Sequence, residues 1–224
     1  MKLNTNNNVY IIAYSCVMVV IVAFLLAFVS STLKPRQDVN VALDKKKQIL
    51  AALNIRNLSD SEAGAKYNEV VLSDEATKEN NEAAFNLNSA DYKAGNYKVY
   101  ECQVNGEKKY VVPVYGMGLW GAIWGYVAVN EDGNTVYGAY FNHDSETAGL
   151  GADIKDSKEW QDKFIGNQIY GADGNPALKV VKSRDLKNPE SEVDGITGAT
   201  LTSNGVSDML QDGFAKYKTL LSHE

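Results

Sequence analysis

The residues best suited to chemistry lie near the C-terminus, in the stretch from Asp194 to Ser203. Its sequence, DGITGATLTS, places glycines and hydroxyl side chains close together. Apolar residues then follow at helical spacing: Val206, Met209, Leu210, Phe214 and Tyr217. A helix is therefore predicted to begin here, and backbone N–H groups at a helix N-terminus favour phosphate. The stretch is a candidate phosphate site, although the same residues also suit an ordinary turn with Thr202 or Ser203 as the N-cap.

A second glycine-rich segment, YGMGLWG, runs from Tyr115 to Gly121 between two predicted strands. Its glycines permit unusual backbone angles and the close approach of a ligand. Leu119 and Trp120 offer flat apolar surface beside them. The alternative interpretation is a tight turn with a tryptophan in the core.

A third segment, HDSETAGLG, runs from His143 to Gly151 directly after a predicted strand. It combines a carboxylate, a hydroxyl and two glycines in a short loop. Taken alone, Glu146 would be interpreted as a solvated carboxylate and His143 as a loop histidine without a role.

The stretch at Asp194 resembles the flavinylation motif of the FMN-binding domain family. In that motif an Asp, two variable residues, Ser or Thr, Gly, Ala and a final Thr precede a helix, and the final Thr carries FMN through a phosphoester bond. Thr200 holds that position here. The two other loops are similar to the family's Gly-x-Gly-Leu-Trp and His-x-Glu-Thr-x-Gly-Leu-Gly segments, except that Ala148 stands where a proline is common.

The resemblance implies a flavin site built from these three loops. Leu119 and Trp120, or Leu150, would pack on the ring, while Glu146 and Thr147 would hydrogen-bond its polar edge or the ribityl chain. The phosphate would lie against the N–H groups at the helix start. The other expected cofactor-binding residues are Gly118, Gly149, Thr197, Gly198, Ala199, Leu201 and Thr202.

Attachment of FMN to Thr200 needs activation, because threonine is a poor nucleophile near neutral pH. Asp194 is a nearby acid that could help, or it is simply a turn residue; the resemblance implies a separate flavin transferase that donates FMN from FAD. The sequence has no metal-ligand pattern, no Ser-His-Asp arrangement and no fingerprint for NADH. We therefore predict an electron relay without a catalytic residue of its own.

The elements that must position these loops are strands and helices in the C-terminal half. Alternation predicts strands over Tyr97–Val104 and Lys109–Val114, joined at Asn105-Gly106, a dipeptide that favours tight hairpins. Further strands are predicted over Trp120–Val129, Thr135–Asn142 and 177–183, and a helix over Ile154–Ile165. The predicted fold class is α+β, an antiparallel β-meander sheet with packed helices.

An apolar segment near the N-terminus predicts one transmembrane helix. No charged residue occurs from Val9 to Val29, and about 20 apolar residues suffice to cross a bilayer. A cleavable signal peptide would have a shorter apolar core and a small-x-small cleavage site, so an uncleaved anchor is favoured. Cys16 is interpreted as a lipid-facing or helix-packing residue.

Charge leaves the orientation of this anchor open. Lys34, Arg36 and the lysines at 45–47 follow the span, which weakly favours a cytoplasmic domain. The resemblance implies the opposite, a flavin domain in the periplasm of a bacterium, anchored in the inner membrane, and long domains cross largely regardless of charge. A net charge of −6 argues against a nucleic-acid partner.

The predicted organisation is a tail and transmembrane helix over 1–33, a juxtamembrane helix and polar connecting region over 34–94, and an FMN-binding domain over 95–224. The resemblance is strongest for the anchored flavin subunits of ion-translocating membrane redox complexes. One such complex passes electrons from NADH to quinone and pumps sodium; a related one couples ferredoxin and NAD. An anchored binding module without redox function is the alternative of another class.

Overall fold

The structure, a computed structural model, describes residues 7–72 and 99–221. The chain divides into two compact units, Met1–Asp44 and Lys45–Glu224. The long helix α1, Asn8–Ala52, belongs to the first unit up to Asp44 and to the second from Lys45 onward. The division predicted at residues 33 and 94 stays a prediction.

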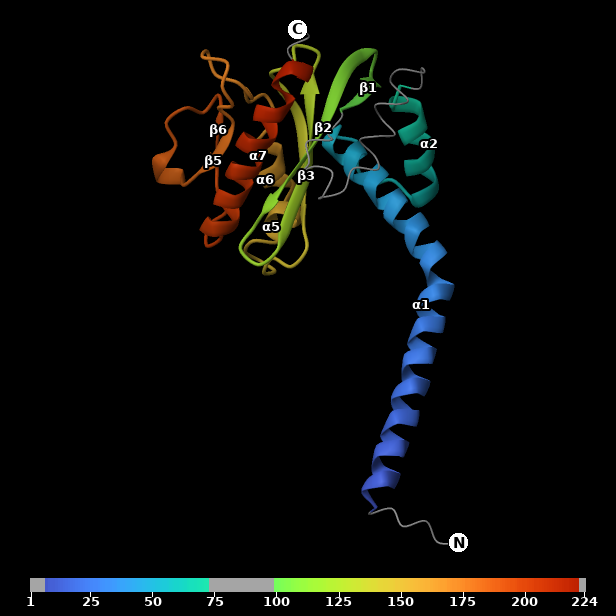
Figure 1. Ribbon diagram of the computed structural model, residues 1–224. Helices are drawn as coiled ribbons and strands as arrows, with labels where there is room; N and C mark the ends of the chain where they lie inside the picture. Colours follow the sequence, from blue (N-terminus) through green and yellow to red (C-terminus); the bar gives the residue numbers. More distant parts are fainter. Residues whose placement is uncertain (1–6, 73–98, 222–224) are drawn as a thin grey trace. The chain divides into compact units, whose positions relative to one another are not determined.

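The second unit is built on a four-stranded antiparallel sheet with strand order β1-β2-β3-β4. The strands are β1 (Tyr100–Val104), β2 (Glu107–Met117), β3 (Ala122–Asn130) and β4 (Val136–His143). This order is the predicted meander, and the α+β fold class is confirmed (Figure 1).

The first hairpin forms at Asn105-Gly106 as predicted. Both residues have positive φ, 54° and 86°, which a two-residue hairpin turn requires and which Asn and Gly adopt most readily. Val104 pairs with Glu107 across the turn. The start predicted at Tyr97 lies outside the described residues.

One face of the sheet is covered by helix α7, Thr200–Leu221, which lies along β2 (Figure 1). The predicted apolar positions Val206, Met209, Leu210, Phe214 and Tyr217 are all buried. Tyr217 Oη also donates a hydrogen bond of 2.9 Å to the carbonyl of Pro113 in β2. The helical spacing in the sequence thus identified the buried face of α7 correctly.

The last turns of α1 and the loop after it bond to the strands of the same unit. Trp124 Nε1 donates to Gln48 Oε1 at 3.1 Å, and Asn54 Nδ2 donates to the carbonyl of Tyr137 at 2.8 Å. Helix α2, Asp60–Val70, follows. Directly after it, Val71 forms an isolated antiparallel β-bridge with Cys102 of β1. The predicted juxtamembrane helix is therefore the end of α1 and not a separate element.

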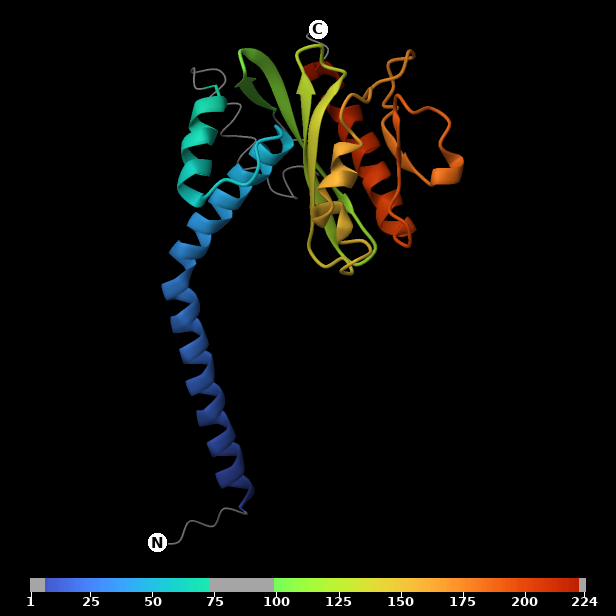
Figure 2. The ribbon, with the colours of Figure 1, turned by 180° about the vertical axis from the view of Figure 1, so that it is seen from behind.

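The helix predicted over Ile154–Ile165 is wrong as a single element. Two short helices occur instead, α5 (Asp153–Asp156) and α6 (Lys158–Asp162), seen beside the sheet in Figure 2. Ser157 interrupts them, because it is extended and its Oγ caps α6 by accepting from Trp160 N. Trp160 and Phe164 are both buried, with ring centroids 5.1 Å apart.

The sequence predicts only half of a second, two-stranded sheet. Strand β5 (Lys179–Val181) lies within the strand predicted over 177–183, but its parallel partner β6 (Glu192–Asp194) lies outside every predicted strand. Residues Ser183–Asp185 form a short 3₁₀ helix, η1, between them. This small sheet packs on α7, since Val180 N donates to Ser207 Oγ at 3.3 Å.

In the first unit, α1 carries the apolar segment predicted to span a membrane. Its side chains from Ile11 to Val29 are exposed. It is the one helix among the described residues that is long and apolar enough to cross a bilayer.

Candidate flavin site

The threonine singled out by the sequence is the first residue of α7. Thr200 is exposed, and the loop before it turns at Gly198, whose φ of 82° suits glycine. The loop is tied down at Gly195 N, which donates to the carbonyl of Val181 at 2.8 Å, and at Ile196 N, which donates to Ser203 Oγ at 3.1 Å. Thr200 therefore projects from an ordered helix start, where N–H groups of the first turn lack helical partners.

The alternative in which Thr202 or Ser203 is the N-cap is wrong, because both residues lie inside the first turn of α7. Ser203 accepts from the loop that precedes the helix, and Thr202 is buried. The hydroxyl groups of this stretch therefore differ in their surroundings. Those of Thr202 and Ser203 lie on buried residues, and those of Thr197 and Thr200 lie on exposed ones.

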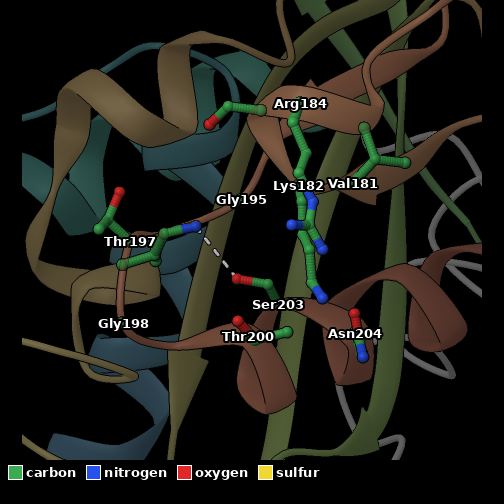
Figure 3. A pocket seen from close by; sticks show the side chains of 11 residues that line it. Val181, Lys182, Arg184, Gly195, Thr197, Gly198, Thr200, Ser203 and Asn204 are labelled. Atoms are coloured by element: carbon green, nitrogen blue, oxygen red, sulfur yellow. Dashed lines mark hydrogen bonds between the residues drawn. The ribbon is translucent and has the colours of Figure 1, made fainter.

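A pocket of about 450 Å³ opens beside Thr200 (Figure 3). Thr197, Gly198 and Asn204 line it from the loop and the helix. Lys182 and Arg184 line it from the end of β5 and from η1, and their side chains extend toward the first turn of α7 in Figure 3. Two cations and a helix N-terminus thus face the same space, a combination that binds phosphate.

Asp194, which the sequence suggested as an aid to Thr200 or as a turn residue, lies at the end of β6. Its carboxylate accepts a hydrogen bond from Ser183 Oγ and pairs with Lys163 Nζ at 3.7 Å. Because Ser183 stands between Lys182 and Arg184, Asp194 anchors the turn that presents both cations to the pocket.

The loops at 118–121 and 143–151 meet the start of α7 through Glu146. Its Oε1 accepts from Trp120 N at 2.9 Å, and its Oε2 accepts from Thr202 Oγ1 at 2.7 Å. Burial works to raise the pKa of Glu146, but the bonds from Thr202 and from the N–H groups of residues 119–121 outweigh it and lower that pKa below its ordinary value. Glu146 is 7% exposed, so its interpretation as a solvated carboxylate is wrong.

The carboxylate of Glu146 occupies space that is open only because residues 118 and 151 are glycines. A Cβ at Gly118 would lie 2.4 Å from Glu146 Oε1, and one at Gly151 would lie 2.5 Å from Oε2. The glycines of these two loops are therefore needed for the contact between protein segments, as well as for the approach of any ligand.

Apolar side chains around the same helix start are exposed. Trp120 is 67% exposed and Leu201 is 58% exposed, so the alternative of a core tryptophan is wrong. Leu119 and Leu150 are exposed as well, and Leu150 lies close enough to Gly198 that a Cβ there would be 2.9 Å from it. This apolar surface, formed by Leu119, Trp120, Leu150 and Leu201, is of the kind that binds a flat ligand or a partner.

The structure thus brings the three predicted loops together at one helix end. The exposed members are Leu119, Trp120, Thr147, Gly149, Leu150, Thr197, Gly198, Thr200 and Leu201, whereas Glu146, Ala199 and Thr202 are buried. Thr147 contributes its carbonyl to the loop by accepting from Ala152 N at 3.0 Å. Sequence reasoning missed Lys182, Arg184 and Asn204, since no local pattern shows that these polar side chains line the same pocket as Thr200.

The three loops, the two cations and the start of α7 thus form one candidate site for a cofactor that carries a phosphate. Residues 118–215 match the family model described as the FMN-binding domain. The class of protein is therefore an FMN-binding domain preceded by a long apolar helix.

Relatives that match most of the chain define the family. The chain is 32% identical over 227 aligned residues to the C subunit of the Na(+)-translocating NADH-quinone reductase of Haemophilus ducreyi, covering 88% of each chain. It is 34% identical to the protein of that name in Vibrio alginolyticus, covering 78% of this chain and 77% of the other. The chain belongs to the family of Na(+)-translocating NADH-quinone reductase C subunits. Of the two related complexes that the sequence suggested, the relatives thus support the one that passes electrons from NADH to quinone.

Solved structures agree with the fold. The crystal structure of the Na(+)-translocating NADH-quinone reductase C subunit from Parabacteroides distasonis superposes with a TM-score of 0.75 at 34% identity, covering 86% of this chain and 98% of that one. NqrC from Shewanella oneidensis, at 24% identity and a TM-score of 0.63, covering 83% of this chain and 100% of that one, has the same fold.

Proposed function

We propose that this chain is the membrane-anchored subunit of a sodium-pumping NADH:quinone oxidoreductase that carries FMN covalently on Thr200 and relays electrons within the complex. One observation carries the proposal: Thr200 is exposed as the first residue of α7 and lines the same pocket as Lys182 and Arg184. When bound, FMN supplies the redox chemistry. The chain holds the FMN and excludes water from part of its surface.

The residues present fit the phosphate end of the cofactor. A phosphodiester on Thr200 keeps one negative charge, which the N–H groups at the start of α7 and the cations Lys182 and Arg184 compensate. Gly198 and Ala199 have little or no side chain beside that position, so backbone can approach the phosphate closely. Thr197 offers a further hydroxyl at the rim of the pocket.

The apolar surface fits the ring. Leu119, Trp120, Leu150 and Leu201 are exposed around the same helix end, and an isoalloxazine covering them removes apolar area from water on both partners. Thr147 and Gly149 are exposed in the same loop as Leu150, and we assign them to the polar rim of the ring. Glu146 already accepts a protein hydrogen bond on each of its two oxygens.

Attachment requires a second protein. Thr200 Oγ gives up its proton and bonds to the phosphorus of the FMN half of FAD, while the bond from that phosphorus to AMP breaks and AMP leaves. A flavin transferase supplies the FAD and the base that takes the proton, since a threonine hydroxyl is a poor nucleophile without one.

The anchor and its orientation complete the proposal. Helix α1 has the length and composition of a single transmembrane span, so it would hold the flavin domain at the inner membrane of a bacterium. We place the domain on the periplasmic side, with its other redox partners among the remaining subunits of the complex. The organisation proposed is an anchor over 1–33, a connecting region over 34–94 and an FMN-binding domain over 95–224.

Mass spectrometry tests the proposal directly. The full chain, co-expressed with a flavin transferase and solubilised in detergent, is expected to gain the mass of one FMN less one water on the peptide that contains Thr200. A denatured gel band is expected to fluoresce under ultraviolet light. If neither signal appears, the chain is not a covalent-FMN relay, and an anchored binding module becomes the better description.

The two cations beside Thr200 are expected to set the rate of attachment. In Lys182→Gln/Arg184→Gln, the rate of FMN transfer to the chain should fall about tenfold or more, because the phosphate loses charge-assisted bonds and about 1.4 kcal/mol corresponds to a factor of ten. The measurement is a time course of the FMN mass increment with purified transferase and FAD. The control Lys155→Gln/Lys187→Gln removes the same charge away from the pocket and should transfer FMN at the original rate; equal slowing in both variants would show a general charge effect.

Trp120 is expected to contact the flavin ring. In Trp120→Ala, emission from the attached FMN should rise about twofold or more, because an indole in contact quenches flavin fluorescence and an aromatic contact of about 0.5–1.5 kcal/mol is lost. Ile165→Ala removes another exposed apolar side chain, outside the three loops, and should leave emission unchanged. Unchanged emission in Trp120→Ala would mean that the ring does not lie on this surface.

A further inference from the structure

Both carboxylate oxygens of Glu146 already accept hydrogen bonds from the protein, and these partners suggest a role other than contact with the flavin. Each carboxylate oxygen has a protein donor, Trp120 N at 2.9 Å and Thr202 Oγ1 at 2.7 Å. Its own backbone N–H donates to His143 Nδ1 at 3.2 Å within the loop. The three loops of the site are thus joined at one buried carboxylate.

We propose that Glu146 is a positioning residue: by bonding Thr202 and Trp120 at once, it fixes the first turn of α7, which carries Thr200, relative to the apolar surface that carries Trp120. This inference rests on the proposed function and deepens it, because it assigns to Glu146 an action through neighbouring residues in place of contact with the cofactor.

The space around the carboxylate supports this assignment. Gly118 and Gly151 approach it so closely that a Cβ on either would lie 2.4 or 2.5 Å from an oxygen. Glu146 is 7% exposed, and Thr202 and the 118–121 loop already contact its oxygens. Under this proposal, Glu146 accepts its hydrogen bonds from Trp120 and Thr202, and not from the polar edge of the flavin.

The charge state makes these bonds directional. The lowered pKa of Glu146 keeps the carboxylate ionised at neutral pH, and an ionised carboxylate only accepts hydrogen bonds. Thr202 must then donate, which fixes the orientation of its hydroxyl as well as its position. Bonds to a buried charge are among the stronger ones in proteins, so the link between the loop and the helix is stiff.

The position of Thr202 gives this link its functional consequence. Thr202 lies in the same helical turn as Thr200, so fixing one fixes the backbone that carries the other. At the other oxygen, Trp120 is held by its backbone N–H, which leaves its indole free on the surface. A phosphate attached at Thr200 and a ring lying on Trp120 would then meet a site whose two halves are already set at the right separation.

The test compares variants that break the link from either side. Glu146→Ala and Thr202→Val, in the full detergent-solubilised chain, are each expected to slow FMN transfer to Thr200 about tenfold, and the double variant should be no slower than the slower single variant. Glu146→Gln should recover most of the rate, since its amide oxygen can accept from Trp120 N and its NH₂ can donate to Thr202 Oγ1. Glu159→Ala, an exposed carboxylate on α6, serves as the control.

A second measurement does not depend on the flavin. Hydrogen exchange of the chain without FMN should become faster at Trp120 and in residues 196–203 in both Glu146→Ala and Thr202→Val, while the core of β2 and β3 stays protected. Unchanged exchange at these two places would overturn the positioning role. If exchange responds as expected but the original chain never acquires FMN, the proposed function fails and the link itself stands.

The remaining outcomes are also decisive. If Glu146→Gln shifts the absorption maximum or the reduction potential of the attached flavin while Thr202→Val does not, Glu146 contacts the flavin and the proposal is overturned. If both single variants lower the melting temperature but transfer FMN at the original rate per folded molecule, the link is merely structural, and the positioning role is again excluded.

Discussion

Replacing Thr200 with alanine is expected to leave a folded chain without covalent FMN. The oxygen that forms the phosphoester is removed, and no neighbouring hydroxyl stands at the same place: Thr202 is buried on Glu146, and Ser203 accepts from Ile196 N. Because Thr200 is exposed, the free energy of unfolding should change by no more than about 0.5 kcal/mol. The measurements are the mass of the peptide around residue 200 and the melting temperature of the chain.

Two controls sharpen this result. Thr200→Ser keeps a hydroxyl at the helix start and should still acquire FMN. Thr197→Ala removes an exposed hydroxyl from the same pocket and should also keep the covalent flavin, since Thr197 contributes only to the rim. Retention of one FMN in Thr200→Ala, on any peptide, would place the attachment site elsewhere.

Gly205→Ala is expected to destabilise the flavin domain by about 1–3 kcal/mol, which lowers the melting temperature by about 2–10 °C. Gly205 lies on the buried face of α7, and a Cβ there would stand 2.3 Å from the carbonyl oxygen of Met117 at the end of β2. Backbone cannot move aside as a flexible side chain can, so the helix must shift away from the sheet. Circular dichroism of the full chain in detergent would measure the loss.

Gly64→Ala is the matched control for this substitution. Gly64 also lies within a helix, α2, and a Cβ there would meet nothing within 4 Å. Alanine is the better helix former, so this variant should gain about 0.5–1 kcal/mol. Equal effects at Gly205 and Gly64 would show that the close approach of α7 to β2 does not limit the size of residue 205.

Several elements could be predicted because the signals for them are local. The positive φ angles at Asn105 and Gly106 follow from residue type, and the buried face of α7 follows from a spacing of three and four residues. The loops that converge on α7 could be predicted only as candidates, because their glycines and hydroxyls also suit ordinary turns. Their convergence depends on the sheet topology: β2 and β4 are both antiparallel to β3, so they run in the same direction and finish at the same end of the sheet.

Other elements depend on contacts that are distant in the sequence. Strand β6 is three residues long and exists by parallel pairing with β5, which no local pattern in Glu192–Asp194 reveals. The helix predicted over 154–165 fails at Ser157, where a local cap competes successfully with helix continuation. The alternation pattern assigns Trp120 to a strand, yet it lies in the turn before β3, because the bond from its N–H to Glu146 shapes that turn.

By itself, the sequence determined that this chain has an apolar helix long enough to span a membrane, an α+β domain, and a threonine at the start of a helix suited to carry a phosphate. The helix and the fold class follow from composition and periodicity, whereas the choice of the threonine follows from the resemblance of its motif to the flavinylation motif. Only the tertiary structure decided which charged residues share the site. Lys182 and Arg184 line the same pocket as Thr200 because β5 pairs with β6, and Glu146 is buried where Trp120 and Thr202 donate to it. The role of a carboxylate or a cation depends on the groups that it contacts. Here those groups lie on segments that are distant in the sequence and that only folding brings together.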